Sequence, residues 1–263
     1  MIRYAVLGSG SSGNSYIISY NGCSILFDAG FSLKQLRERT QRSGIDFSTV
    51  QALFITHLHP DHARGAGVFA RKTNVPVFFH DSIDDQYSQF AALKIPSDSH
   101  SHFSPDAAVI IKDFSVTGFY TSHDSPHCVG FFIEVKGRAF LLLTDTGVLL
   151  PHMYNYGERS DVLFLEANYD SSMLERGPYP YPLKRRISGE FGHLSNSDAI
   201  GFLNTISTPK DQHVYFCHLS KTNNDENILL RSCENGLTWK GARTICTNGE
   251  MYSSTISIEG NRL

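Results

Sequence analysis

The chain has 263 residues, 41% of them hydrophobic, and its formal net charge at pH 7 is −3. The charge argues against a generally basic surface that coats nucleic acid, and no stretch reaches the ~20 apolar residues of a membrane span. We expect residues 1–263 to form one domain with a sizeable core. The five cysteines are odd in number without C-x-x-C spacing, and the short apolar N-terminus does not match a signal peptide. These features predict a cytoplasmic protein with reduced cysteines and no membrane partner.

The first predicted strand is followed by the glycine-rich segment Gly8-Ser9-Gly10-Ser11-Ser12-Gly13, which fits G-x-G-x-x-G. A dinucleotide-binding motif of this form must open a helix. Here two β-rich runs follow instead, residues 14–20 and 23–27, and Asn21-Gly22 between them indicates a β-hairpin. We therefore expect no nucleotide binding here, but a loop that lets the backbone pass close to a site.

Ser32 and Gln35 have capping-box spacing, which predicts a helix that ends near Ser43.

A cluster of metal-type ligands follows the next predicted strand. An apolar strand over residues 50–55 then leads directly into Thr56-His57-Leu58-His59-Pro60-Asp61-His62, an H-x-H-x-D-H pattern. Because Pro60 lacks an N–H, we predict a loop, which can turn several side chains toward one point. Neutral imidazole and carboxylate ligands suit zinc, iron and manganese.

The region after this motif contains further histidines. We predict a helix over residues 63–72 and an irregular segment over residues 96–105. His80 follows a strand and is interpreted as structural. His100 and His102 resemble the start of the first motif but lack the D-H that completes it, so we interpret them as part of a solvated or substrate-facing loop.

Three later strands each deliver a possible metal ligand. Predicted strands that end near residues 120, 143 and 217 are followed by His123, Asp145 and His218. Between the last two, a strand over residues 161–167 precedes a rigid proline-rich connector over residues 178–182. Helices are predicted over residues 198–206, with an N-cap among residues 195–197, and over residues 225–234.

The possible ligands at or just after strand ends number seven: His57, His59, Asp61, His62, His123, Asp145 and His218. Seven donors suit two divalent metal ions that share one carboxylate, and Asp145 is the candidate bridge. We expect zinc, with manganese or iron as alternatives that the same ligands accept. A hydroxide between the two ions would attack a carbonyl carbon or a phosphorus at neutral pH. Asp28, at the end of a buried strand, is interpreted as an acid that supports a metal-bound histidine.

With this pattern the chain resembles the metallo-β-lactamase fold superfamily over essentially its whole length. The resemblance implies an α/β (α+β) fold, an αββα sandwich of two mixed β-sheets flanked by helices, with the metals at one edge between the sheets. It implies that one metal is bound by His57, His59 and His123. It also implies that the other metal is bound by Asp61, His62 and His218, with Asp145 as the bridge and Asp28 as the supporting acid.

Four segments are similar to those of the YycJ/WalJ-type members of this superfamily: residues 8–15, 121–124, 192–196 and 218–224. Those members are regarded as single-domain 5′-to-3′ DNA exonucleases, so the resemblance implies a nucleic acid substrate, DNA in preference to RNA. Asp61 and His193 are the expected catalytic residues. His193 resembles the loop histidine of ribonuclease Z, which would contact the scissile phosphate or protonate the leaving oxygen. Tyr169 departs from the pattern, because a histidine is expected there, and this puts in doubt a ligand or acid role at that position.

Several features favour a phosphodiester over other substrates of this superfamily. Asp145, not a cysteine, stands at the bridging position. The cationic triplet Lys184-Arg185-Arg186 precedes a predicted helix start, where phosphates could be held. The residues expected to contact substrate are Lys184, Arg185, Arg186, Ser195, Asn196 and Lys221. Three aromatic residues either pack or stack on bases of a single strand: Tyr179, Tyr181 and Phe191. The alternatives are a hydrolase of a small thioester, lactone or cyclic phosphodiester, and a non-catalytic binding module. The sequence leaves the oligomeric state open.

Overall fold

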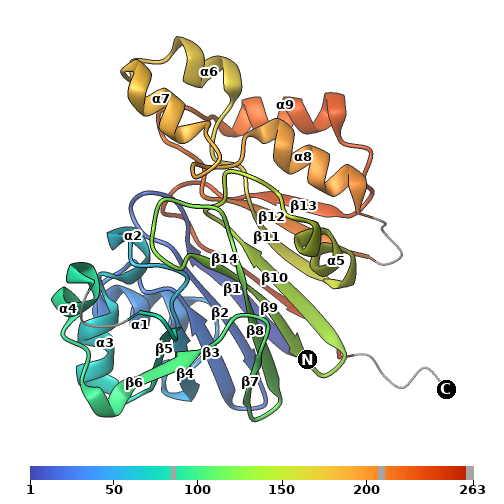
Figure 1. Ribbon diagram of the computed structural model, residues 1–263. Coiled ribbons are helices and arrows are strands. Elements are labelled where there is room, and N and C mark those ends of the chain that lie inside the picture. Colours follow the sequence, from blue (N-terminus) through green and yellow to red (C-terminus); the bar gives the residue numbers. More distant parts are fainter. Residues whose placement is uncertain (84–86, 207–210, 259–263) are drawn as a thin grey trace.

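The computed structural model describes residues 1–83, 87–206 and 211–258, and its framework is two seven-stranded sheets (Figure 1). The first sheet has the order β14 (Tyr252–Ile256), β1 (Ile2–Gly8), β2 (Ser15–Tyr20), β3 (Cys23–Phe27), β4 (Val50–Phe54), β5 (Val77–His80) and β6 (His100–Phe103). The second has the order β13 (Ala242–Ile245), β12 (His213–Cys217), β11 (Val162–Glu166), β10 (Arg138–Leu143), β9 (Val129–Val135), β8 (Phe114–Tyr120) and β7 (Ala108–Ile111). Each sheet is antiparallel on one side and parallel on the other.

Helices cover the outer face of each sheet. The first sheet carries α1 (Leu33–Arg42), α3 (Ala66–Thr73) and α4 (Ser88–Leu93), and the second carries α5 (Pro151–Arg159), α8 (Asn196–Thr205) and α9 (Glu226–Gly236). Three short helices lie near the sheet ends: α2 (Pro60–Ala63), α6 (Ser171–Arg176) and α7 (Tyr181–Ile187). Figure 1 shows α6 and α7 projecting from the sandwich. The predicted αββα architecture is confirmed.

The core has three layers because the central strands are buried on both faces. In β4, Ala52 and Phe54 enter the core between the sheets, while Leu53 packs under the helices of the first sheet. This follows from the two-residue period of a strand. Aromatic rings dominate the inter-sheet layer, where the rings of Phe54 and Phe78 stack with centroids 4.6 Å apart. All five cysteines are buried and free. Among the described residues no helix is long and apolar enough to cross a membrane.

The prediction of a loop through Pro60 was wrong for its second half. Pro60 is the first residue of α2, where its missing N–H needs no partner. The predicted helix over residues 63–72 is interrupted, because α2 ends at Ala63 and α3 begins at Ala66. The three histidines and the aspartate of the motif are therefore split between the end of a loop and one turn of helix, which fixes Asp61 and His62 on the same element.

The prediction of an irregular segment over residues 96–105 was also wrong. Residues 100–103 form β6, which pairs in parallel with β5 at the edge of the first sheet. Its first three side chains are polar and not fully buried, so the pairing with β5, not an apolar pattern, makes it a strand. The connector over residues 178–182 was predicted only in part, because Tyr181 and Pro182 already belong to α7, where proline is tolerated in the first turn.

Candidate metal centre

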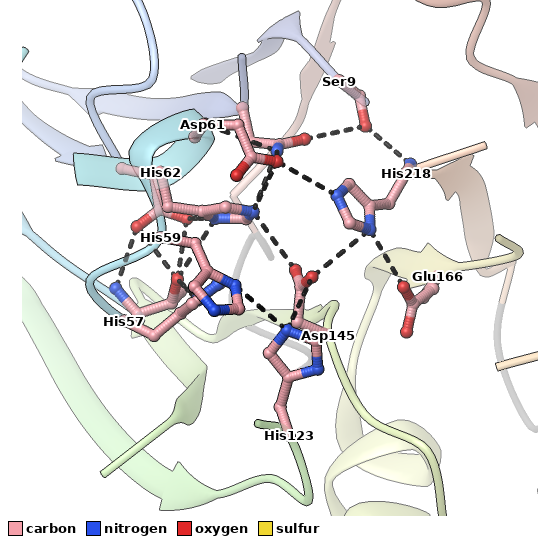
Figure 2. Close-up of polar contacts among 12 residues, drawn as sticks. Ser9, His57, His59, Asp61, His62, His123, Asp145, Glu166 and His218 are labelled. Atoms are coloured by element: carbon pink, nitrogen blue, oxygen red, sulfur yellow. Dashed lines mark hydrogen bonds and ion pairs between the residues drawn. The ribbon is translucent and has the colours of Figure 1, made fainter. Parts of the chain in front are cut away.

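Strand ends from both sheets converge at one edge of the sandwich (Figure 2). His57, His59, Asp61 and His62 follow β4 of the first sheet. Three more residues follow strands of the second sheet: His123 after β8, Asp145 after β10 and His218 after β12. The carboxyl ends of neighbouring parallel strands meet at the same sheet edge, where sites in α/β proteins commonly form.

Three acidic or imidazole residues at these strand ends adopt a left-handed backbone. The φ angles are 59° for Asp28, 58° for Asp145 and 59° for His218. This conformation is uncommon for residues other than glycine, although aspartate, asparagine and histidine tolerate it best. Each of the three follows a buried strand and turns the chain sharply into the site. Such backbone strain at several positions of one cluster is typical of a functional site.

The seven donors form two triads with a shared carboxylate. His57, His59 and His123 can offer ligand atoms that all lie within 4.8 Å of one another, and so can Asp61, His62 and His218. Asp145 lies between the triads. One of its oxygens is 3.3 Å from His62 Nε2, and the other is 3.7 Å from His123 Nε2. These two groups have the same members as the two sites that the sequence resemblance implied. Two further groups of neighbouring donors overlap with them: His57, His62 and Asp145, and Asp145, Glu166, His193 and His218.

The free ring nitrogens of the histidines point to the same cluster. In four rings Nδ1 is already engaged: in His57 by Thr56 Oγ1 at 3.0 Å, in His62 by Asp28 at 2.7 Å, in His123 by the Gly192 carbonyl at 2.9 Å and in His218 by Glu166 at 2.9 Å. Nε2 is therefore the nitrogen that each of these rings could offer to an ion. A ligand imidazole is usually held in this way through its other nitrogen.

Two buried atoms support the fit to metal ions. His57 Nε2 and Asp145 Oδ2 are buried and make no hydrogen bond within the described part of the chain. Such orphaned groups are costly unless something binds them. A set of imidazole and carboxylate donors fits zinc, manganese or iron, so the residues present suit divalent ions.

Asp28 and Thr56 hold the metal motif from behind. Asp28 is fully buried and accepts hydrogen bonds from the Thr56 backbone N–H at 2.8 Å and from the Thr56 hydroxyl. His62 Nδ1 makes a hydrogen bond to the second oxygen of Asp28. The carboxylate therefore has no lone pair directed at the cluster of metal-type donors. This geometry fits the supporting role expected for Asp28.

Glu166, which the sequence analysis did not single out, joins two histidines. Its Oε1 atom is 2.7 Å from His193 Nδ1 and 2.9 Å from His218 Nδ1, while Oε2 accepts the backbone N–H groups of Thr146 and Leu194. All its acceptor capacity is used, so Glu166 orients these rings and is not itself a ligand. The signal that could have found it is its place at the end of β11, the same position that made Asp28 and Asp145 candidates.

Asn14 is a second residue that the sequence analysis missed. Its Oδ1 accepts the Gly10 N–H at 2.8 Å, which turns Nδ2 toward Asp61 Oδ2 at 3.2 Å and His62 Nε2 at 2.9 Å. The Asn14 backbone N–H also donates to the Asp61 carbonyl. The glycine-rich segment thus passes against the metal motif, as expected.

The charges of the site favour cations. Burial lowers the pKa of His57 well below its usual value, so this ring is neutral, as a metal ligand must be. Burial also disfavours the charged form of His62, but Asp145 and Asp28 outweigh it and raise its pKa to about 9. Burial opposes ionisation of Asp61 as well, yet the hydrogen bond with His218 and the nearby His62 lower the pKa of this carboxyl.

A cavity of about 300 Å³ opens above the two triads. His193 lines it, as do Arg186, Lys221, Tyr179 and Phe191. A larger open groove of about 780 Å³ lies beside Arg37, Phe47 and Lys72 and contains none of the clustered donors. The smaller cavity is therefore the candidate functional site, because metal-type donors line it.

We expected the cationic triplet near a helix N-terminus, but it lies in the last turn of α7. Only Arg186 lines the cavity, where it forms an ion pair with Asp124. Lys184 donates to the Glu175 carbonyl at 2.6 Å, and the Arg185 guanidinium lies 6.0 Å from the centre of the Tyr181 ring. The helix was missed because the prolines before it suggested a connector.

Ser195 and Asn196 are turned away from the cavity, which corrects the expectation that they contact substrate. Ser195 caps α8 through the Asp198 N–H, and the Asn196 amide pairs with that of Asn224 at 3.0 and 2.8 Å. Both side chains are buried. Tyr169 is buried as well and does not line the cavity, and burial raises its pKa to about 12, so its hydroxyl remains protonated at neutral pH.

Comparison with known proteins identifies the class. A sequence profile of the beta-lactamase superfamily domain matches residues 24–219. The chain therefore belongs to the beta-lactamase superfamily, and its two sheets and histidine–aspartate site are those of a metallo-β-lactamase-type hydrolase.

The names of two curated relatives are more specific than the name of the superfamily. The chain is 31% identical over 240 residues to the exodeoxyribonuclease YycJ of Bacillus anthracis, covering 91% of this chain and 90% of the relative. It is 32% identical over 237 residues to the exodeoxyribonuclease WalJ of Streptococcus pneumoniae, covering 89% and 88%.

Solved structures share the fold at low sequence identity. The metallo-β-lactamase fold protein YhfI of Bacillus subtilis is 17% identical, with a TM-score of 0.71 over 96% of this chain and 99% of that one. Zn²⁺-bound PqqB of Methylobacterium extorquens is 15% identical, with a TM-score of 0.70 over 95% and 99%. At these identities the likeness shows the fold alone.

Proposed function

We propose that the chain is a metal-dependent phosphodiesterase that removes nucleotides from the 5′ end of DNA. The observation that carries the proposal is the content of one cavity, which combines the two donor triads with His193, Arg186 and Lys221. The names of the two curated relatives, both exodeoxyribonucleases, support the substrate class.

In this proposal His57, His59 and His123 would hold one divalent ion, and Asp61, His62 and His218 would hold the other, with Asp145 placed between the two triads. Bound ions of this kind supply Lewis acidity toward water and toward the phosphate oxygens. Asp61 is ionised because its pKa is lowered, and its carboxylate lines the cavity, where it is proposed to orient the attacking water and accept its proton.

His193 is proposed to protonate the leaving oxygen. Its Nδ1 is bound to the buried Glu166 carboxylate at 2.7 Å, which leaves Nε2 as the nitrogen available to a ligand in the cavity. The Glu166 carboxylate fixes the plane of the ring through this hydrogen bond. After proton transfer from Nε2, His193 remains neutral and keeps its hydrogen bond to Glu166.

Arg186 and Lys221 are proposed to bind phosphate oxygens. Arg186 is 61% exposed at its side chain even though it pairs with Asp124, so a substrate phosphate can compete for it. The net charge of −3 limits such contacts to a local patch, which makes binding sensitive to salt.

The test is cleavage of single-stranded DNA labelled at either end, with Mn²⁺ or Zn²⁺, by the wild type and by His59→Ala. The proposal predicts early release of labelled mononucleotide from the 5′ end, and no release by the variant, which lacks one ligand. Early release from the 3′ end would refute the direction, and equal cleavage by His59→Ala would refute the assigned centre.

The small cavity favours one second candidate, a hydrolase of a small thioester, lactone or cyclic phosphodiester. A volume of about 300 Å³ is at the lower end of the range for small-molecule sites. Turnover of such a compound that far exceeds turnover of oligonucleotides, with the same dependence on His59, would favour this candidate.

A further inference from the structure

The cavity above the metal centre has two chemically different walls. The donors come from the strand ends, whereas residues 179–191 contribute an apolar wall: Tyr179, Leu183, Ile187 and Phe191. Arg186, on the same turn of α7 as Leu183 and Ile187, places a cation beside this apolar surface. A ligand that fits such a cavity carries an anionic group at one end and a flat apolar group at the other.

Phe191 is held in place while its side chain stays exposed. The residue is 58% exposed, although large aromatic side chains usually gain stability by burial. Its backbone is fixed by the bonds from Gly192 N–H to the Gly189 carbonyl and from His193 N–H to the Ile187 carbonyl, both 2.9 Å. A Cβ atom at Gly192 would lie 2.1 Å from the Ile187 carbonyl, so only glycine permits this close approach.

The Phe191 ring has no aromatic partner within the described part of the chain. It stands two residues before His193, the proposed acid, and it shares the cavity with Tyr179. An exposed aromatic ring of fixed backbone, beside cations and reactive groups, is the arrangement with which proteins stack a nucleobase while holding its phosphate.

Building on the proposed phosphodiesterase activity, we propose that Phe191, with Tyr179, forms a nucleobase subsite that stacks the terminal base of a single-stranded end. Stacking uses the π-face that all bases share, so this subsite binds a terminal nucleotide with little sequence preference. The cavity volume of about 300 Å³ is of the size of a single nucleotide unit.

The test compares two single-stranded oligonucleotides that differ only in whether the terminal nucleotide at the cleaved end carries a base or is abasic. The ratio of kcat/KM for the two substrates is measured for wild type, Phe191→Ala, Phe191→Trp and Tyr181→Ala. Tyr181 is the matched control, because it is an aromatic residue of the same segment, is 72% exposed and does not line the cavity. Metal content and melting temperature are measured in parallel.

We expect the wild type to prefer the base-bearing end by about tenfold, which is the scale of one stacking contact. Phe191→Ala should reduce this preference nearly to one, whereas Phe191→Trp and Tyr181→Ala should retain it. An equal loss of activity by Phe191→Ala on both substrates, or an unchanged preference, would overturn the subsite. If the wild type cleaves neither oligonucleotide, the proposed function itself fails, which is a different result from cleavage without a base preference.

Discussion

Glu166 gives two histidines of one site different tasks. Its Oε1 atom binds Nδ1 of both His193 and His218, but only His218 belongs to a donor triad. His218 therefore presents Nε2 to an ion, and His193 presents Nε2 to the cavity. At the residue scale, the same carboxylate thus couples the metal centre to the proposed acid.

The first prediction concerns His193→Ala. Removal of a general acid typically lowers kcat by about 100-fold or more, and metal content should not change because His193 stands outside the two triads. The measurements are kcat and KM on single-stranded DNA and bound metal by mass spectrometry. His152→Ala, at another partly buried histidine that does not line the cavity, is the control and should retain activity. Loss of metal together with activity would make His193 a ligand and contradict the assignment.

The second prediction concerns protons at His62. Its pKa in the metal-free fold is about 9, above the ordinary histidine value of about 6.5. Its protonation therefore stabilises the metal-free protein fully below pH 6.5, and this contribution is lost as the pH rises through 9. Metal binding needs neutral His62, so metal affinity should rise over the same pH range with release of protons.

This release is measured by calorimetric titration with Mn²⁺ at pH 7.5 in two buffers of different ionisation enthalpy. The observed binding enthalpy should differ between the buffers. Equal enthalpies would mean that His62 is already neutral or is not a ligand.

At the scale of elements, α7 carries both a cation and part of the apolar wall into the cavity. Arg186 pairs with Asp124, whose other oxygen is 3.6 Å from His59 Nε2 and 3.5 Å from His123 Nε2. The helix is thereby tied to two histidines of one triad. A phosphate that displaces Asp124 from Arg186 would change the surroundings of both rings.

The third prediction compares two arginines of this helix. Arg186→Ala should raise KM for DNA by about tenfold and reduce the slope of log affinity against log salt by about 1, as expected for one lost phosphate contact. Arg185→Ala should have neither effect, because Arg185 lies over Tyr181 outside the cavity. Both variants are assayed between 50 and about 200 mM salt. Equal effects of the two substitutions would indicate general charge attraction instead of a specific contact.

At the scale of the whole molecule, the metal centre lies across the seam between the two sheets. His57, His59, Asp61 and His62 come from the first sheet, and His123, Asp145 and His218 come from the second. Ions held by donors of both sheets bind only the folded arrangement, so they stabilise it by mass action.

The fourth prediction is that chelation lowers the melting temperature. With ions at about 1,000 times their dissociation constant, the stabilisation is about 4 kcal/mol, which corresponds to a shift of roughly 10 °C for a chain of this size. Thermal unfolding of the metal-replete and EDTA-treated protein measures the shift. His59→Ala should show a much smaller change, and an identical change in both would place the stabilising ions elsewhere.

The sequence was sufficient for the parts of the fold and site that depend on local order. The donors fall at strand ends with diagnostic spacing, and the long apolar strands that deliver Asp145 and His218 are read directly from residues 138–143 and 214–217. Parts that depend on tertiary contact were missed. β6 exists because it pairs with β5. The contacts of Asn14 with Asp61, and of Glu166 with His193 and His218, join residues more than 25 positions apart in sequence.

Nucleotide release from 5′-labelled single-stranded DNA, measured as a function of ions bound per chain, decides whether the cluster is a two-ion nuclease centre. We expect that metal-free protein releases nothing, that labelled mononucleotide is the first product once ions bind, and that release is maximal when both triads are filled, at about two ions per chain. Maximal release with one ion would contradict the two-ion centre. No release at any metal loading, with rapid hydrolysis of a small ester or cyclic phosphodiester by the same sample, would contradict the nuclease.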